Sequence, residues 1–253
     1  MDQSFENSLL RGWSREMQAA VETYRKPILD EKVVSVIKLA CETFKQEIQV
    51  FFMSVDVVET YIYLNEAYGR KIEDPFLDMC VIIFIMSKYF GGGADLKIPV
   101  IEKFMYKICG LNYSAKTIIR AEIDILQMLQ YKLPLSTALD EMDTFFEKFS
   151  REYHLKDILR PLCEEILIMM YCQRKVWVKH LRKYYQSDPA TFNHLMTSKV
   201  FLPAGILVSA FNTTNYQFIL DVEGLVNDLN GFIGIHPRHI FVLSDIIINL
   251  MKG

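Results

Sequence analysis

The stretch that decides the fold is PFLDMCVIIFIMSKYFGGG, residues 75–93. Its apolar run, residues 76–86, is broken only by Asp78, which predicts a helix buried on all sides. Asp74 and Pro75 supply a capping residue and a proline for the first turn. Three glycines end the run, since glycine adopts the left-handed conformation that closes helices. A Walker-type phosphate loop is excluded, because Ala94 follows the last glycine where a Lys-Ser or Lys-Thr pair is required.

Outward from this helix, apolar residues recur at helical spacing along nearly the whole chain, and no useful strand alternation appears. We therefore expect an all-α protein. The expected helices of the first half cover 5–24, 28–50, Ser54 to Gly69, 75–90, Ile98 to Cys109 and Ser114 to Gln130. Those of the second half cover 136–149, one or two helices within 155–185, a short helix capped by Asp188-Pro189, and 201–211, 215–229 and 236–251.

The order of these elements predicts a five-helix unit used twice. The expected parts are an N-terminal helix in residues 1–27, a first lobe in 28–134 and a second lobe in 135–253. Gly and Pro together number only 19, which leaves little room for linkers.

Bulk properties exclude several classes of protein. A net charge of −3 gives no global attraction to nucleic acid or anionic membranes. The first residues lack the basic and apolar regions of a secretory signal, and the longest apolar runs are about half a membrane span, so we expect a soluble protein. The five cysteines form no Cys-x-x-Cys pair and are expected to be reduced core residues.

Two segments carry a resemblance to a known family. Ile85-Met-Ser-Lys-Tyr-Phe-Gly91 and Ala121-Glu-Ile-Asp-Ile-Leu-Gln-Met-Leu-Gln-Tyr-Lys-Leu-Pro134 resemble the ends of the third and fifth helices of the cyclin box. This resemblance implies a two-lobed cyclin fold and a regulatory protein without catalytic activity. It also implies a cyclin-dependent kinase as partner, held by Lys88, Tyr89, Glu122, Leu126 and Tyr131.

Other features of the chain depart from cell-cycle cyclins. Phe90-Gly91 stands where they carry an acidic pair, and Asn65 where they carry an aspartate. The second half is similar to the cyclin N-terminal domain-containing proteins that act in meiotic crossover formation. This likeness implies a nuclear, chromosome-associated protein that works beside meiotic recombination proteins.

A local basic stripe offers a rival function. Arg174, Lys175, Lys179, Arg182 and Lys183 surround aromatic residues, a combination that suits contact with DNA or with recombination proteins in a kinase-independent scaffold. The alternative is an amphipathic helix that buries Val176, Leu181 and Tyr184 and exposes a solvated basic face.

Nothing in the sequence indicates an enzyme, a cofactor or a metal site. The histidines of His236-Pro-Arg-His239 lack an evident third ligand and are expected to be structural.

Overall fold

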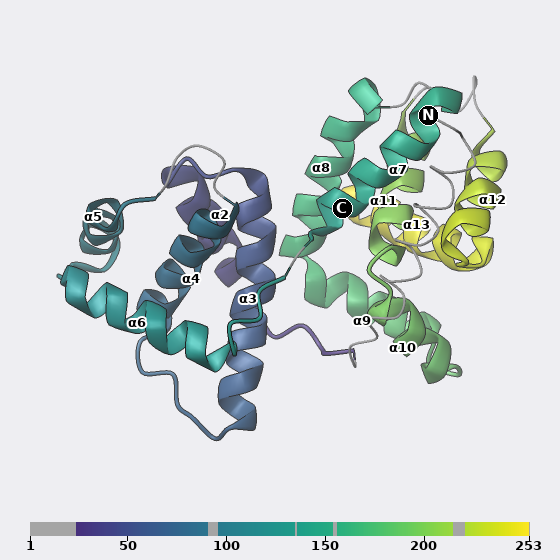
Figure 1. The fold of residues 1–253 in the computed structure, drawn as a ribbon. Coiled ribbons are helices and arrows are strands. Elements are labelled where there is room, and N and C mark those ends of the chain that lie inside the picture. Colours follow the sequence, from purple (N-terminus) through teal and green to yellow (C-terminus); the bar gives the residue numbers. More distant parts are fainter. Residues whose placement is uncertain (1–23, 91–95, 135, 154–155, 215–220, 253) are drawn as a thin grey trace. The chain divides into compact units, whose positions relative to one another are not determined.

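A computed structural model describes residues 24–90, 96–134, 136–153, 156–214 and 221–252. Within these ranges the chain forms twelve helices and no strand (Figure 1). The first six are α2 Glu31–Thr43, α3 Ile48–Ala67, α4 Pro75–Phe90, α5 Ile98–Cys109, α6 Ala115–Met128 and α7 Ala138–Tyr153. The others are α8 Lys156–Cys172, α9 Arg174–Tyr184, α10 Pro189–Thr197, α11 Phe201–Thr213, α12 Val222–Ile233 and α13 Pro237–Lys252.

The helices group into two compact units. The first unit runs from Ile28 to Thr137 and holds α2 to α6. The second runs from Ala138 onward, with α7 to α13, and includes the described residues 24–27. The predicted joint at residue 134 falls in the connection between α6 and α7. The predicted N-terminal helix lies in residues 1–23, outside the described part of the chain.

Helix α4 is the centre of the first unit and packs against α2, α3 and α6. Every residue from Met79 to Ser87 is buried, which confirms the helix predicted from its unbroken apolar run. It begins where the sequence indicated, since Asp74 Oδ1 accepts a hydrogen bond from the Leu77 N–H at 3.0 Å. At its other end, Ser87 Oγ accepts from the Leu96 N–H at 3.3 Å and so holds the returning chain.

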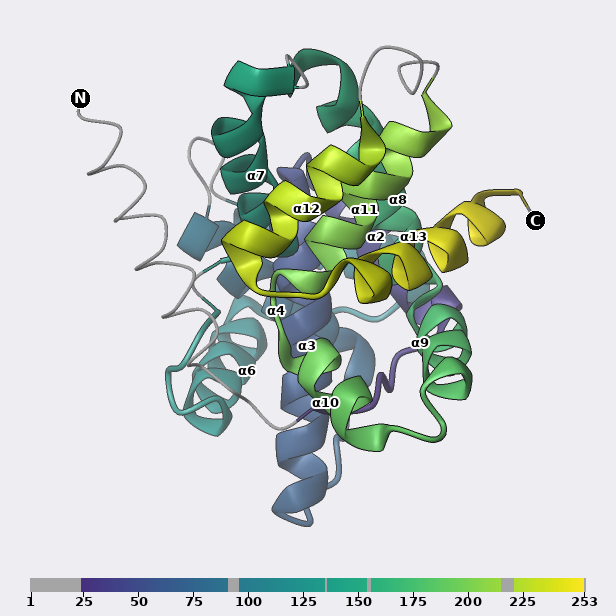
Figure 2. The same cartoon turned by 90° about the vertical axis from the view of Figure 1, so that its right-hand side faces the viewer.

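Helix α11 plays the same part in the second unit, where it packs against α7, α8, α12 and α13 (Figure 2). Residues 203–211 are all buried. The contact with α13 is close, because Gly205 lies against the side chain of Leu243. Ser209 Oγ also lies 3.1 Å from Ser244 Oγ, so two hydroxyl groups satisfy each other inside this interface.

The predicted boundary between the helices expected over 28–50 and 54–69 is in the wrong place. The break expected between Val50 and Ser54 does not occur, because Ser54 is buried inside α3. The chain breaks earlier, where Lys45 takes a left-handed φ of 55° and ends α2. Serine indicates a cap only when its hydroxyl faces a free N–H, whereas Ser54 lies fully buried within a continuous apolar helix.

The cysteines are free thiols in the structure, and three of them are core residues as predicted. Burial raises the pKa of Cys41 and of Cys80 to about 12 and raises the pKa of Cys163. Cys172 is half-buried. The prediction is wrong for Cys109, which is exposed as the last residue of α5, where its thiol donates to the Met105 carbonyl at 2.9 Å. The spacing of apolar residues predicts which face of a helix is buried. It does not show that the last turn of α5 extends beyond the helices that pack against it.

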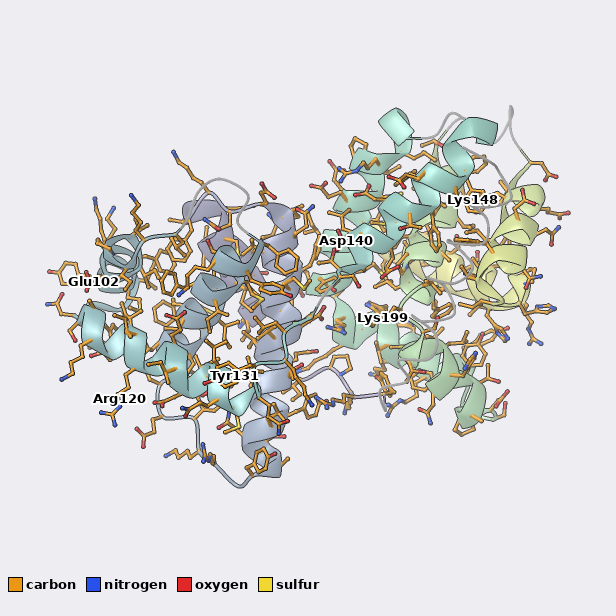
Figure 3. The ribbon with its side chains drawn as sticks, in the orientation of Figure 1. Glu102, Arg120, Tyr131, Asp140, Lys148 and Lys199 are labelled. Atoms are coloured by element: carbon orange, nitrogen blue, oxygen red, sulfur yellow. The ribbon has the colours of Figure 1, made fainter. Side chains whose placement is uncertain are left out.

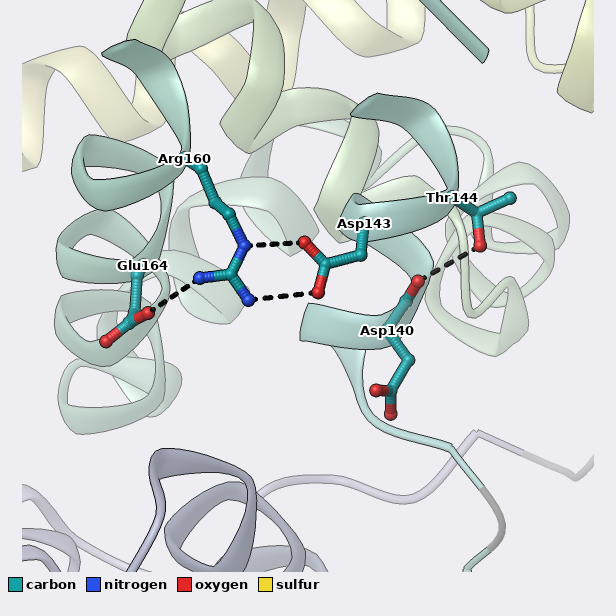
Figure 4. A network of polar contacts seen from close by, with 5 residues as sticks. All are labelled: Asp140, Asp143, Thr144, Arg160 and Glu164. Carbon is teal, nitrogen blue, oxygen red and sulfur yellow. Dashed lines mark hydrogen bonds and ion pairs between the residues drawn. The ribbon is translucent and has the colours of Figure 1, made fainter. Parts of the chain in front are cut away.

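A polar network ties α7 to α8 (Figure 4). Arg160 donates from Nε and Nη2 to the two carboxylate oxygens of Asp143 at 2.7 and 3.0 Å, and its remaining nitrogen lies 3.6 Å from Glu164. The hydrogen bonds to Asp143 raise the pKa of the Arg160 guanidinium. Bidentate pairing fixes the direction of both side chains, so the network links α7 to α8 at a defined position.

No single described helix has both the length and the apolar character to cross a bilayer. Two strongly bent pairs, α10 with α11 and α12 with α13, meet those two criteria only when joined.

Candidate partner-binding site

Lys88 and Glu122 come together from two helices of the first unit. Lys88 is the first exposed residue after the buried run of α4, and Glu122 lies midway along α6. The Lys88 ammonium forms an ion pair with Glu122 Oε1 and lies 4.0 Å from the ring centroid of Phe84. Side-chain exposure is 41% for Lys88 and 15% for Glu122, so the lysine remains accessible while the carboxylate is largely covered.

This ion pair stabilises the first unit itself. A partly exposed pair contributes on the order of 0 to 1 kcal/mol, and the cation above Phe84 adds a similar amount. The dipole of α4 also favours a cation in its last turn. Lys88 therefore has three stabilising contacts before any partner is considered, and only its exposed side remains for intermolecular binding.

The aromatic residues predicted for the site are accessible. Tyr89 follows Lys88, is exposed, and packs edge-on against Phe90 with ring centroids 4.9 Å apart. Tyr131 lies just beyond the end of α6 and is 67% exposed (Figure 3). The Tyr131 N–H donates to the Leu126 carbonyl at 2.9 Å. The Leu126 side chain, also predicted for the site, is half-buried.

The turn that presents Tyr131 has an unusual backbone. Gln130 and Tyr131 both take left-handed conformations, with φ of 54° and 57°. Such a φ is uncommon for residues other than glycine and costs of order 1 kcal/mol or more each. The Gln130 amide group also donates to the Tyr68 hydroxyl at 3.4 Å, which joins the end of α6 to the end of α3.

The structure adds two residues that the sequence reasoning missed. Ile119 and Ile123 are 44% and 48% exposed on α6. Their spacing places them, with Leu126, on one side of the helix next to Glu122. We call Ile119, Ile123 and Leu126 the α6 flank. The signal was present in the sequence, because Ile118, Ile125 and Met128 already form a complete buried stripe and leave these isoleucines in surplus.

The basic stripe is placed on α9 in the second unit, with a different inner face from the one predicted. Val176 and Tyr184 are exposed, and the buried residues are Trp177, Val178 and Leu181. Two consecutive apolar positions face inward because α9 lies against α8, α10 and α13 at once. Trp177 donates from Nε1 to the Met170 carbonyl at 2.9 Å, so it is part of the core.

The two histidines at the start of α13 have partners within the fold. His239 Nδ1 shares a hydrogen bond of 2.6 Å with the Tyr185 hydroxyl, and burial lowers the pKa of His239. His236 Nδ1 accepts from the Arg238 N–H at 3.2 Å. Within the described ranges, no group of three or more His, Cys, Asp or Glu side chains is placed to hold a metal ion.

Comparisons with known proteins give a likeness of structure only. No protein-family model and no curated protein matches the sequence. Among solved structures, the X-ray structure of a viral cyclin from herpesvirus saimiri is similar, with a TM-score of 0.65 and 14% sequence identity. The match covers 96% of this chain and 97% of the viral chain, so both units are included. The predicted all-α cyclin fold is therefore confirmed.

Proposed function

We propose that this protein is a cyclin-like regulatory subunit that binds a cyclin-dependent kinase through the exposed end of α4 and the adjoining face and C-terminal end of α6. The observation that carries the proposal is the Lys88–Glu122 ion pair beside the α6 flank, of which Ile119 and Ile123 are exposed and Leu126 is half-buried. Tyr89 and Tyr131 add accessible aromatic rings to the same two helix ends. The likeness to a viral cyclin over nearly the whole chain supports this proposal.

The arrangement suits a helical partner. A surface that binds a helix needs apolar anchors at helical spacing with a charged group at the border, and the α6 flank with Lys88 supplies both. Tyrosines are frequent among the residues that dominate binding energy. The protein needs no catalytic group of its own, because such a partner acts by shifting the kinase toward the state with its lysine–glutamate pair and activation loop in place.

The cellular setting is part of the proposal. The likeness of the second half to the cyclin N-terminal domain-containing proteins supports a role in meiotic crossover formation. The protein would then work in the nucleus, on chromosomes and beside recombination proteins.

The five kinase-binding residues proposed from the sequence remain Lys88, Tyr89, Glu122, Leu126 and Tyr131, to which we add Ile119 and Ile123.

The test is binding of the purified protein to a panel of cyclin-dependent kinases. Lys88→Glu, Glu122→Lys and Ile123→Lys are each expected to weaken binding at least tenfold, since each puts a wrong charge at the border or centre of the surface. Leu39→Lys is the matched control for Ile123→Lys, because Leu39 is similarly exposed on α2. Circular dichroism verifies that every variant is folded.

The charge-swapped double variant, Lys88→Glu with Glu122→Lys, separates the internal role of the pair from binding. It restores the ion pair and therefore the stability lost in the single variants, yet it should not restore kinase binding. Equal kinase binding by the double variant and by wild type would show that the Lys88–Glu122 ion pair only stabilises the first unit and does not contribute to the binding surface. If no kinase binds at all, a kinase-independent scaffold for recombination proteins becomes the better explanation of the fold.

A further inference from the structure

Positive charge is concentrated in one part of the second unit. Between residues 166 and 220 the chain has six Lys and Arg residues and a single acidic one, Asp188. The whole chain has a net charge of −3, so the residues outside this stretch have a net charge of −8. Asp188 is occupied as the cap of α10, where its carboxylate accepts from the Thr191 N–H at 3.1 Å.

Helix α9 carries five of these six cations and no carboxylate. Lys175, Lys179 and Lys183 are exposed at successive intervals of four residues, so they follow one side of the helix about 6 Å apart along its axis. Among the described residues none of the three has an acidic partner within ion-pair distance. Three free ammonium groups in a row produce a strong local potential.

Neighbouring groups hold two further cations at this surface. The guanidinium of Arg182 lies 5.1 Å from the ring centroid of Phe192 on α10. Arg238, at the start of α13, donates to the hydroxyl of exposed Tyr184 at 3.3 Å. We call Lys175, Lys179, Arg182, Lys183 and Arg238 the α9 basic surface.

We propose that the α9 basic surface binds the phosphate backbone of a nucleic acid without reading its sequence. A row of cations suits a linear polyanion, and a spacing of about 6 Å is close to two phosphate steps on one strand of a duplex, each of which is about 3.4 Å along its axis. An acidic peptide fits less well, because acidic motifs are typically held by clusters of arginine, whereas three of these five cations are lysines, and other peptides are held by apolar anchors. The only large exposed apolar residues on α9 are Val176 and Tyr184, and Tyr184 is engaged with Arg238.

The test uses the intact 253-residue chain without a kinase and a fluorescent 20-base-pair duplex of arbitrary sequence. We expect a Kd of roughly 10⁻⁴ to 10⁻⁶ M at physiological salt, with a linear fall of log affinity against log salt. The variant Lys175→Gln/Lys179→Gln/Lys183→Gln should lose at least tenfold in affinity. Its salt slope should be smaller in magnitude by about 2.7, or ~0.9 for each lost phosphate contact.

The matched control is Lys103→Gln/Lys107→Gln/Lys116→Gln, which removes three exposed lysines from the first unit and changes the net charge equally. It should bind the duplex as wild type does, and so should Lys88→Glu, which separates this test from that of kinase binding. Equal losses of duplex affinity in the two triple variants would show that the effect depends only on net charge, which would overturn the proposal. Failure to bind the duplex, or tighter binding of polyglutamate than of duplex, would also overturn it.

Discussion

Gly205 shows how a single position controls a helix contact. A Cβ atom added there would lie 2.5 Å from Cδ2 and 2.7 Å from Cγ of Leu243, closer than non-bonded carbons approach. The hydroxyl pair formed by Ser209 and Ser244 lies in the same interface. Small residues on α11 therefore let two helices approach until their polar groups meet, and a larger side chain at 205 must displace the side chain of Leu243.

Gly205→Ala should lower the free energy of unfolding by about 1–3 kcal/mol, the usual cost of forcing an extra carbon into a packed core. Urea denaturation measures this loss. The matched control is Gly231→Ala on α12, where an added Cβ meets nothing within 4 Å. The control should be neutral or up to about 1 kcal/mol more stable, since alanine favours helices over glycine. An equal loss in both variants would mean that helix packing at 205 is not the cause.

At the scale of elements, the sequence located helices best where a local signal has one meaning. Asp74 with Pro75, Gly110 after α5 and Asp188 with Pro189 each mark an end that the structure confirms. The prediction that a helix begins at Ser54 was wrong, because a serine is compatible both with a helix cap and with a helix interior. Only tertiary packing decides between them, and the residues that cover α3 belong to other helices, α2, α4 and α6.

Helix α4 also carries one polar group that its surroundings disfavour. Asp78 accepts a hydrogen bond from the Tyr61 hydroxyl of α3 at 2.9 Å, but burial raises its carboxyl pKa above the ordinary value of 3.8. The folded state therefore binds a proton at Asp78 more tightly than the unfolded state does. This group favours folding below pH 3.8, and its contribution is lost as the pH rises through the elevated pKa.

Asp78→Asn should therefore raise the Tm at pH 7, because the amide cannot ionise and its oxygen still accepts from Tyr61. The gain over wild type should shrink as the pH falls through the elevated pKa of Asp78. Thermal melts between pH 7 and pH 4 measure this difference. Asp245→Asn, at an exposed carboxyl of α13, serves as the control. A gain that stays constant with pH would show that ionisation of Asp78 is not its origin.

At the scale of the whole molecule, both units follow one plan, with a helix buried on all sides and amphipathic helices around it. The sequence revealed this plan because such a helix lacks any polar stripe, as both α4 and α11 do. The candidate site was less predictable. Lys88 and Glu122 followed from the cyclin resemblance, but the exposure of Ile119 and Ile123 depends on which neighbours cover α6, which spacing alone does not specify.

Hydrogen exchange tests this plan in the intact protein. Amides of α4 and α11 should exchange most slowly in their respective units, because opening either helix exposes the core of its unit. Helix α5, which packs mainly against α6, should exchange much faster. Mass spectrometry of peptic fragments provides the comparison. Exchange of α4 as fast as that of α5 would contradict the central role of α4.

The two left-handed residues after α6 have a consequence for the stability of this turn. A glycine at 130 or 131 would relieve a backbone cost of order 1 kcal/mol or more. The side chains present instead are an amide that reaches Tyr68 and an aromatic ring turned toward solvent. The turn at the end of α6 is therefore less stable than a glycine turn would be, and in exchange it displays two side chains that glycine would remove.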